Sequence, residues 1–302
     1  MKVTIVMAIA IIVIALVAMP PKQWRAPDIK TIPDNKEGEL IKYGLQLISR
    51  TSYYLGPKGS VAQISNGMNC QNCHLNAGTK LWGNNYAAVA STYPKFRERS
   101  GTIESIEKKI NDCLERSLNG KAIDSNSREM RAMVAYIKWI GKNVHKGIKP
   151  RGTGTNNLKY LNRAADTVKG KIIFISKCAK CHGADGLGEL NANGTEYIYP
   201  PLWGPNSYNT GAGIYRISKF AGFVKDNMPF NETSHANPEF NDEECWDVAA
   251  YVNSQPRPSK DVSKDWPDIK KKPVDDPFGP YADTLSESRH KYGPFKSQPQ
   301  KQ

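Results

Sequence analysis

The chain has 302 residues, 42 lysines and arginines, 29 aspartates and glutamates and six cysteines, and its formal net charge is +13. This length allows two domains of about 100 residues each, with extensions at both ends. A chain with this positive charge attracts small anions or acidic proteins. We expect no nucleic-acid partner, because the sequence has no basic run, no helix-turn-helix pattern and no aromatic-basic RNA-binding signature.

The first predicted element is an apolar segment at the amino terminus. Residues 3–19 are apolar except for Thr4, and two prolines then end the run. The run is long for the core of a signal peptide and slightly short for a full membrane span. Cleavage after Ala18 would place Leu16 where a small residue is preferred, so an uncleaved membrane anchor is slightly favoured over a removed signal. Either alternative places the body of the protein in the periplasm.

Two Cys-x-x-Cys-His pentapeptides follow, at Cys70–His74 and Cys178–His182. In such a motif the two thiols bond covalently to a haem and the histidine becomes an axial ligand of its iron. The alternatives are zinc binding and a dithiol redox pair, which we disfavour because each histidine directly follows its second cysteine and no further ligand cluster is evident. The sequence therefore predicts two covalently bound haem c groups. Their attaching residues are Cys70, Cys73 and His74, and Cys178, Cys181 and His182.

The sixth ligand of the second iron is predicted to be Met228, which Pro229 follows. An amphipathic stretch downstream, Glu243–Val252, predicts a closing helix. A thioether-Pro loop followed by such a helix resembles the class I cytochrome c domain. The alternative is that Met228 is a core residue.

The first half contains a matching amphipathic helix over Arg128–Ile140. The two helices share a Val-Ala-Tyr or Val-Ala-Ala-Tyr segment, which aligns Tyr136 with Tyr251. Met228 lies 23 residues before Tyr251, and the residue 23 positions before Tyr136 is Cys113. We therefore predict that Cys113 ligates the first iron, where a thiolate would lower the reduction potential and supply a nucleophile.

Two alternatives for Cys113 remain open. It could pair with Cys245 in a disulfide, since these are the two cysteines outside the haem motifs. It could also be a buried inert thiol, with Met130 or Met133 as the ligand. Those methionines lie on the packing face of the predicted helix, where a core role is expected.

Several segments resemble the dihaem thiosulfate dehydrogenases, also called tetrathionate synthases, over nearly the whole mature chain. They are Cys70–Thr79, Ile110–Gly120, Pro201–Pro205, Asn227–Pro229, Lys272–Asp275 and His290–Phe295. The resemblance implies His/Cys ligation of a catalytic first haem and His/Met ligation of the second. It also implies that two thiosulfates are joined into tetrathionate and that two electrons pass to a small acceptor cytochrome.

Coupling two dianions needs positive charge and hydrogen-bond donors near the reacting sulfur. Arg116 lies three residues after Cys113 and is predicted to bind a sulfonate in a bidentate manner, although a haem propionate is an alternative partner. Ser117 and Asn119 offer neutral hydrogen bonds. Further candidate cations, which could equally be surface residues, are Lys121 and Arg128.

Two further expectations concern the second haem. In some family members a lysine competes with the methionine, and Lys219 and Lys225 precede Met228 here. Neither matches such a position clearly, so Met228 alone is the predicted ligand. Trp203 and the turn 211–213 are expected to pack against the porphyrin of this haem.

The predicted fold is mainly α, with two class I cytochrome c-like domains in tandem. A signal peptide or anchor (1–20) and a tether (21–36) precede the first, catalytic domain (37–148), which begins with a helix over Glu37–Arg50. A linker (149–157) leads to the second domain (158–253), whose haem motif follows a helix over Lys169–Cys178. The chain ends in an extended tail (254–302). Alternative functions are the tetrathionate reductase direction of the same enzyme and a non-enzymatic dihaem electron carrier. A dihaem peroxidase is disfavoured, because no candidate for its open coordination position is found.

Overall fold

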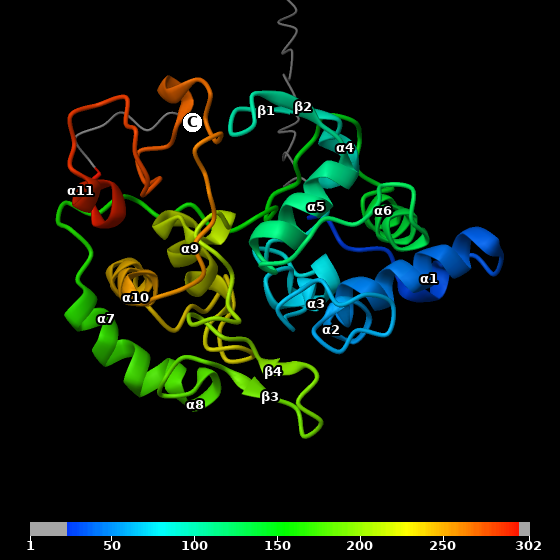
Figure 1. Cartoon of the computed structure of the whole chain (residues 1–302), viewed down its shortest axis with the longest axis horizontal. Helices are drawn as coiled ribbons and strands as arrows, with labels where there is room; N and C mark the ends of the chain where they lie inside the picture. The colour runs from blue at the N-terminus through cyan, green and yellow to red at the C-terminus, as the bar shows by residue number, and fades with distance from the viewer. Residues whose placement is uncertain (1–22, 296–302) are drawn as a thin grey trace, which may run out of the picture.

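The computed structural model describes residues 23–295, and helices make up most of its regular structure (Figure 1). Within this range no helix is long and apolar enough to cross a membrane. The predicted signal peptide or anchor over residues 1–20 lies outside the described residues. The prediction of a mainly α fold is confirmed. Two small antiparallel hairpins also form, β1 (Lys95–Arg97) with β2 (Thr102–Glu104), and β3 (Glu189–Leu190) with β4 (Tyr197–Tyr199).

The first domain is built around α1 (Lys36–Ser49), α5 (Ile106–Arg116) and α6 (Arg128–Ile140). α6 begins after Ser127, whose side chain accepts a hydrogen bond from the backbone N–H of Met130. Its apolar positions recur with the helical period and face the core. Shorter elements complete the domain: η1 (Ile29–Thr31), α2 (Thr51–Leu55), η2 (Cys70–Asn72), α3 (Leu75–Gly78) and α4 (Val89–Thr92).

The second domain begins with α7 (Thr167–Ile173), which continues through the π-helical segment η3 (Phe174–Cys178) into α8 (Ala179–His182). It closes with α9 (Ile217–Asn227) and α10 (Asp242–Ser254), and the short η4 (Gly213–Tyr215) precedes α9. The first turn of α10 contains three acidic residues, whose negative charges stabilise the helix by interacting with the positive end of its dipole.

The two domains repeat one helix crossing, at which a glycine lets two backbones approach closely. A Cβ on Gly44 of α1 would lie 2.0 Å from the carbonyl oxygen of Ala132 in α6, and a Cβ on Gly170 of α7 would lie 1.9 Å from that of Asp247 in α10. In each domain this contact lies four residues before the tyrosine that aligns the two halves of the sequence. The alignment on Tyr136 and Tyr251 therefore corresponds to equivalent places in the fold.

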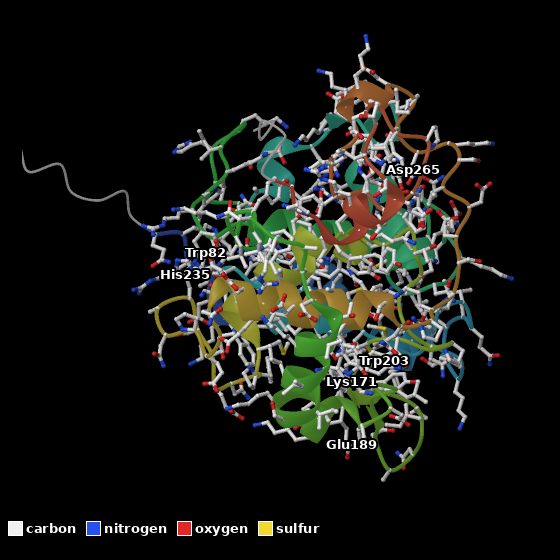
Figure 2. All side chains as sticks on the ribbon, turned by 90° about the vertical axis from the view of Figure 1, so that its left-hand side faces the viewer. Trp82, Lys171, Glu189, Trp203, His235 and Asp265 are labelled. Atoms are coloured by element: carbon white, nitrogen blue, oxygen red, sulfur yellow. The ribbon has the colours of Figure 1, made fainter. Side chains whose placement is uncertain are left out.

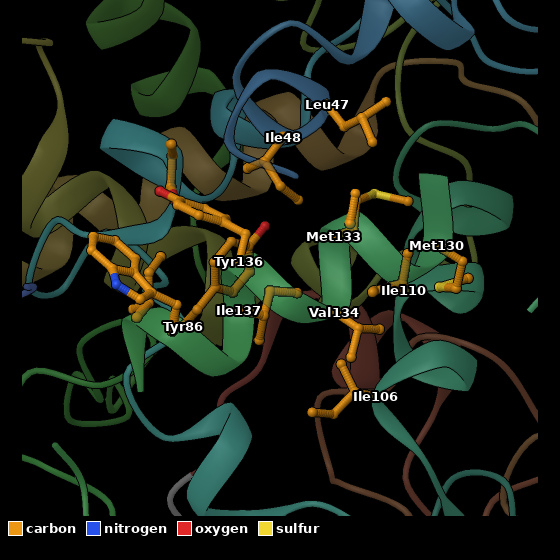
Figure 3. Packing of buried hydrophobic residues seen from close by; sticks show 14 of the residues in the cluster. Leu47, Ile48, Tyr86, Ile106, Ile110, Met130, Met133, Val134, Tyr136 and Ile137 are labelled. Atoms are coloured by element: carbon orange, nitrogen blue, oxygen red, sulfur yellow. The ribbon is translucent and has the colours of Figure 1, made fainter. Parts of the chain in front are cut away.

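Each domain has its own hydrophobic core. In the first domain the fully buried Met130 and Met133 lie in one cluster with Leu47 of α1 and Ile110 of α5 (Figure 3). The second core surrounds Trp246 of α10, which is also almost completely buried.

The tail after α10 runs over both domains and contains η5 (Ile269–Lys271) and α11 (Glu287–Tyr292). Asp275 fixes it to the second domain, because its buried carboxylate accepts hydrogen bonds from Arg216 and from Ser218 at the start of α9. Burial alone would raise the pKa of Asp275, but Arg216 and Ser218 outweigh it and hold this pKa below its usual value.

Three of the predicted helices form close to their expected bounds. The helix expected over Glu37–Arg50 is α1, the one over Arg128–Ile140 is α6, and the one over Glu243–Val252 lies within α10. The helix expected before the second haem motif forms as α7 followed by η3 and starts two residues earlier than expected. The short helices of the tail and the two hairpins were not predicted.

Candidate functional site

The first haem motif begins in η2 and ends directly before α3, and its histidine is oriented by the backbone. The Nδ1 atom of His74 lies 2.5 Å from the carbonyl oxygen of Asn84, so Nδ1 carries the proton and donates it. The Nε2 atom is then the one left to bind iron. The ring of His74 packs on Tyr86, with 4.5 Å between the ring centroids.

Cys113 of α5 lines the same cavity as Cys73 and His74. The two predicted ligands of the first iron, His74 and Cys113, therefore line one cavity although they come from different segments of the chain. Burial alone would raise the pKa of the Cys113 thiol, but Lys109, His74 and Arg99 outweigh it and lower the pKa to about 7. The surroundings of Cys113 therefore favour a thiolate.

The alternatives for Cys113 find no support in the geometry. All six cysteines are free, and Cys245 is fully buried in the core of the second domain. The disulfide alternative is therefore wrong in this structure. Met130 and Met133 belong to the core of the first domain and do not line the cavity of Cys113.

The first cavity, of about 370 Å³, has a cationic wall that the sequence analysis missed. Lys109 and Ser117 lie four residues before and after Cys113, so all three occupy one face of α5 and line the cavity. Arg97 and Arg99 of the β1–β2 hairpin also line it. The spacing of four could have revealed Lys109. Nothing in the sequence around the two arginines indicated that their hairpin borders the site.

Other parts of the chain complete this cavity. The second domain contributes the run Thr210–Arg216 and Lys219, and the tail contributes Val262, Asp265, Trp266, Lys272, Asp276, Pro277 and Phe278. The pocket of the first haem motif is thus assembled from both domains and the tail.

Arg116 is held by the tail. Its guanidinium donates two hydrogen bonds to the carboxylate of Asp265, at 2.7 and 2.8 Å, and one to the carbonyl oxygen of Gly211 at 3.2 Å. The side chains of Arg116 and Asp265 are only 15% and 14% exposed. The sequence predicted a sulfonate or a propionate at this position, and the structure gives the guanidinium a carboxylate partner. Direct contact of Arg116 with a substrate stays a prediction.

The remaining polar candidates lie away from the cavity. The side-chain oxygen of Asn119 accepts a hydrogen bond from Asn209 at 2.9 Å. Lys121 is exposed, and Arg128 lies over the ring of Tyr43 at 4.7 Å. Lys121 and Arg128 therefore correspond to the surface alternative.

The second cavity, of about 310 Å³, brings together the other haem motif and Met228. Cys178, Cys181, His182 and Met228 all line it, and Met228 directly follows the last residue of α9. The Nδ1 atom of His182 lies 2.8 Å from the carbonyl oxygen of Pro200, which again leaves Nε2 for iron. Burial lowers the pKa of His182, which favours the neutral form that ligates metals.

Neither candidate lysine lines this second cavity. Lys219 lines the first cavity and donates to Asn157 at 3.2 Å. Lys225 donates to the carbonyl oxygen of Phe240 at 2.8 Å and pairs with Asp242 at 2.9 Å. The choice of Met228 over a lysine is therefore consistent with the geometry.

The expectation for Trp203 and the turn 211–213 differs from the structure. Trp203 packs in the core between Phe174 and Tyr251, at centroid distances of 4.9 and 5.8 Å, and does not line the second cavity. Residues 211–213 line the first cavity. The sequence could not show that the second domain closes the pocket of the first.

The two cavities adjoin each other, because Cys73 and Ile214 line both. The first cavity is lined by Cys73, His74 and Cys113, and the second by Cys178, Cys181, His182 and Met228. In both motifs the Nδ1 atom of the histidine lies against a backbone carbonyl oxygen. This donor set and these cavity sizes fit a covalently attached haem in each domain. Among residues 23–295 there is no group of three or more His, Cys, Asp or Glu side chains that could hold a metal ion, so the zinc alternative has no complete ligand set.

Comparison with known proteins agrees with this arrangement. Residues 60–145 match the family described as SoxA/TsdA, cytochrome c domain, and residues 167–256 match the family Cytochrome c. A thiosulfate dehydrogenase of Psychrobacter arcticus is 40% identical over 80% of this chain and 71% of its own length. One from Allochromatium vinosum is 37% identical over 79% of this chain and 86% of its own length. The chain belongs to the thiosulfate dehydrogenase family.

Membership of this family makes the chain an oxidoreductase, and its two cytochrome c domains imply covalently bound haem c. The solved thiosulfate dehydrogenase TsdBA from Marichromatium purpuratum superimposes with a TM-score of 0.72 at 29% identity. The match covers 79% of this chain and half of that longer chain. The predicted family and the tandem cytochrome c domains are thus confirmed.

Proposed function

We propose that the protein oxidises two thiosulfate ions to one tetrathionate, with Cys113 as the nucleophile. The observation that carries the proposal is a single one. Cys113 lines the same cavity as His74, together with Arg97, Arg99 and Lys109, and the pKa of its thiol is lowered to about 7. A pure electron carrier has no use for a nucleophilic sulfur in an anion-attracting pocket. The relatives named as thiosulfate dehydrogenases point to the anion.

The residues that would hold the cofactors follow from the two cavities. Cys70 and Cys73 would attach the first haem, and His74 and Cys113 would bind its iron. Cys178 and Cys181 would attach the second haem, and His182 and Met228 would bind its iron. When bound, each haem accepts one electron, so each tetrathionate needs both haems or two encounters with an acceptor.

Two bond changes at the sulfur of Cys113 would join the two thiosulfates. The thiolate sulfur of Cys113 forms a bond to the terminal sulfur of one thiosulfate, and this oxidation releases two electrons. A second thiosulfate then attacks the same sulfur of the bound thiosulfate. The bond to Cys113 breaks, the thiolate is restored, and tetrathionate leaves. No proton is consumed in either step.

The cations of the first cavity would make this coupling feasible. Two thiosulfates carry four negative charges, and their repulsion at close range costs several kcal/mol in a partly buried site. Lys109 on the face of α5 and the two hairpin arginines supply positive charge beside Cys113. Ser117 lies on the same helix face as Cys113, and its hydroxyl can donate a hydrogen bond to a sulfonate oxygen of the substrate.

Electrons would leave through the second domain. The cavities adjoin at Cys73 and Ile214, so the second haem would lie next to the first and pass electrons to a small acceptor cytochrome. We place this reaction in the periplasm, with the segment 1–20 as a removed signal or as an anchor to the cytoplasmic membrane. The tetrathionate reductase direction uses the same groups in reverse and depends on the potentials of the haems and the partner.

The proposal is tested by reaction stoichiometry. Purified protein with both haems attached is mixed with thiosulfate and excess ferricyanide as the electron acceptor. We expect one tetrathionate to form and two ferricyanides to be reduced for every two thiosulfates consumed. Absence of thiosulfate consumption would contradict the proposal. If tetrathionate instead reoxidises the dithionite-reduced protein while thiosulfate reduces nothing, the reductase direction replaces it.

A further inference from the structure

One short loop contacts His74 of the first haem site and Asn227, the residue before Met228, at the second. Residues 80–84 follow the first haem motif, and Trp82 and Asn84 both have left-handed backbones, with φ of 61° and 58°. Such a conformation costs a non-glycine residue about 1 kcal/mol and persists only where neighbours hold it. The linker holds it here. The N–H of Trp82 donates to the carbonyl oxygen of Gly152 at 2.8 Å, and that of Asn84 to Gly154 at 3.0 Å.

The carbonyl groups of this loop point to different haem sites. The carbonyl oxygen of Asn84 accepts the hydrogen bond from Nδ1 of His74, the histidine of the first motif. The carbonyl oxygen of Trp82 accepts a hydrogen bond from the side-chain amide of Asn227, at 3.1 Å. Asn227 directly precedes Met228, the predicted ligand of the second iron. Two carbonyl groups separated by one residue thus contact the proximal side of one site and the distal side of the other.

Asn227 is well placed to transmit a displacement. It is fully buried at the end of α9, and its amide nitrogen also donates to the carbonyl oxygen of Phe223 at 2.9 Å. A buried amide between two carbonyl groups has little freedom to reorient, because a lost hydrogen bond would leave a buried polar group unpaired. A shift of Met228 therefore moves the partner of the Trp82 carbonyl.

The ring of Trp82 makes a second contact with the same region. It stacks on His235, with 4.2 Å between ring centroids and 20° between the ring planes (Figure 2). The Nδ1 atom of His235 lies 3.0 Å from the carboxylate of Asp226, the residue before Asn227. The backbone of Trp82 thus binds Asn227 directly, and its ring contacts Asp226 of α9 through His235.

We infer that the loop 80–84 couples the two haem sites, with Asn227 as a positioning residue that ties Met228 to the loop that orients His74. The inference rests on the haem ligands assigned above and not on the substrate. A failure of thiosulfate oxidation would leave it intact, and its own failure would leave the proposed reaction intact.

The coupling has a direction. A carbonyl oxygen that accepts the Nδ1 proton makes the imidazole a stronger donor, which stabilises ferric iron. Without the amide of Asn227 the Trp82 carbonyl loses its hydrogen-bond donor and the loop is held less firmly, so the hydrogen bond from His74 to Asn84 weakens. The reduction potential of the first haem should then rise, although the changed residue lies in the other domain.

The test is a redox titration without thiosulfate, in which the different axial ligands distinguish the two haems by electron paramagnetic resonance and visible absorption. The variant is Asn227→Ala, and Asn227→Leu, with nearly the original volume, serves as the second variant if the first folds poorly. The reduction potentials of both haems should change, and that of the first haem should rise. A shift confined to the second haem would overturn the inference.

Asn156→Ala is the matched control. Asn156 donates to Asp226 at 3.3 Å, so this change also removes an asparagine hydrogen bond from the end of α9 but leaves the Trp82 carbonyl paired. We expect the first haem of this control to have the same reduction potential as in the wild type. If Asn156→Ala shifted this potential as much as Asn227→Ala does, the inference would also be overturned. Trp82→Asn removes the stack on His235 while keeping a residue that tolerates a left-handed backbone. Trp82→Asn should change the reduction potential of the first haem less than Asn227→Ala does. An equal or larger change would assign the coupling to the ring of Trp82 and contradict the role of Asn227.

Discussion

Cys113 illustrates how far single residues can be assigned from sequence. Its equivalence to Met228 followed from one shared tyrosine, and the structure puts both sulfur atoms in cavities beside a Cys-x-x-Cys-His motif. The charged partners of Cys113 were harder to find. Arg116 was chosen because it lies one helical turn after Cys113, but its guanidinium is paired with Asp265. Lys109, four residues before Cys113, also has helical spacing and lines the cavity.

Lys109 gives a test at the residue scale. Lys109→Ala removes one cation from the wall of the first cavity, and a charge-assisted contact to an anion is worth about 1.5 kcal/mol. We expect KM for thiosulfate to rise about tenfold, with a smaller change in kcat. Steady-state kinetics over a range of ionic strength should also show a weaker salt dependence.

Lys121→Ala is the control for this change, because Lys121 is exposed and does not line the cavity. It should leave KM within twofold of the wild type. If the two alanine variants have the same KM, the cationic wall has no part in binding the substrate.

At the scale of elements, the helices were predictable and their partners were not. α1, α6 and α10 follow from apolar residues at helical spacing, and such a local pattern is fully written in the sequence. The tail has no such pattern, so nothing indicated that Asp265 binds Arg116 or that Trp266 donates its backbone N–H to Arg99 at 2.7 Å. These contacts depend on how the chain returns to the first domain, which is a property of the tertiary structure.

The pair of Arg116 and Asp265 separates a role in holding the tail from a role in binding substrate. A double-mutant cycle with Arg116→Ala and Asp265→Asn, measured by urea unfolding, should give a coupling of about 1–2 kcal/mol for this partly buried pair. Both single variants loosen the tail to a similar degree. If Arg116 also binds a sulfonate, only Arg116→Ala raises KM for thiosulfate, by about tenfold. Equal KM values for the two variants would restrict Arg116 to holding the tail.

At the scale of the whole molecule, the two domains share their sites. The first cavity is closed by residues of the second domain and of the tail, and the second cavity is bordered by Met68 and Asn69 of the first domain. The sequence predicted two similar domains in series, because each motif and its closing helix are local features. It could not predict that they adjoin at Cys73 and Ile214, since that arrangement is set by side-chain packing between segments far apart in the chain.

The central claim is that Cys113 brings electrons from thiosulfate into this dihaem arrangement. The most direct measurement is the rate of haem reduction when thiosulfate is added, without oxygen, to the oxidised protein and to Cys113→Ala. Both proteins must first carry two haems and be fully reducible by dithionite. We predict prompt reduction of the wild type with tetrathionate as the product, and a rate at least a thousandfold lower for the variant, as is typical for loss of a nucleophile. Equal rates in the two proteins would contradict the account.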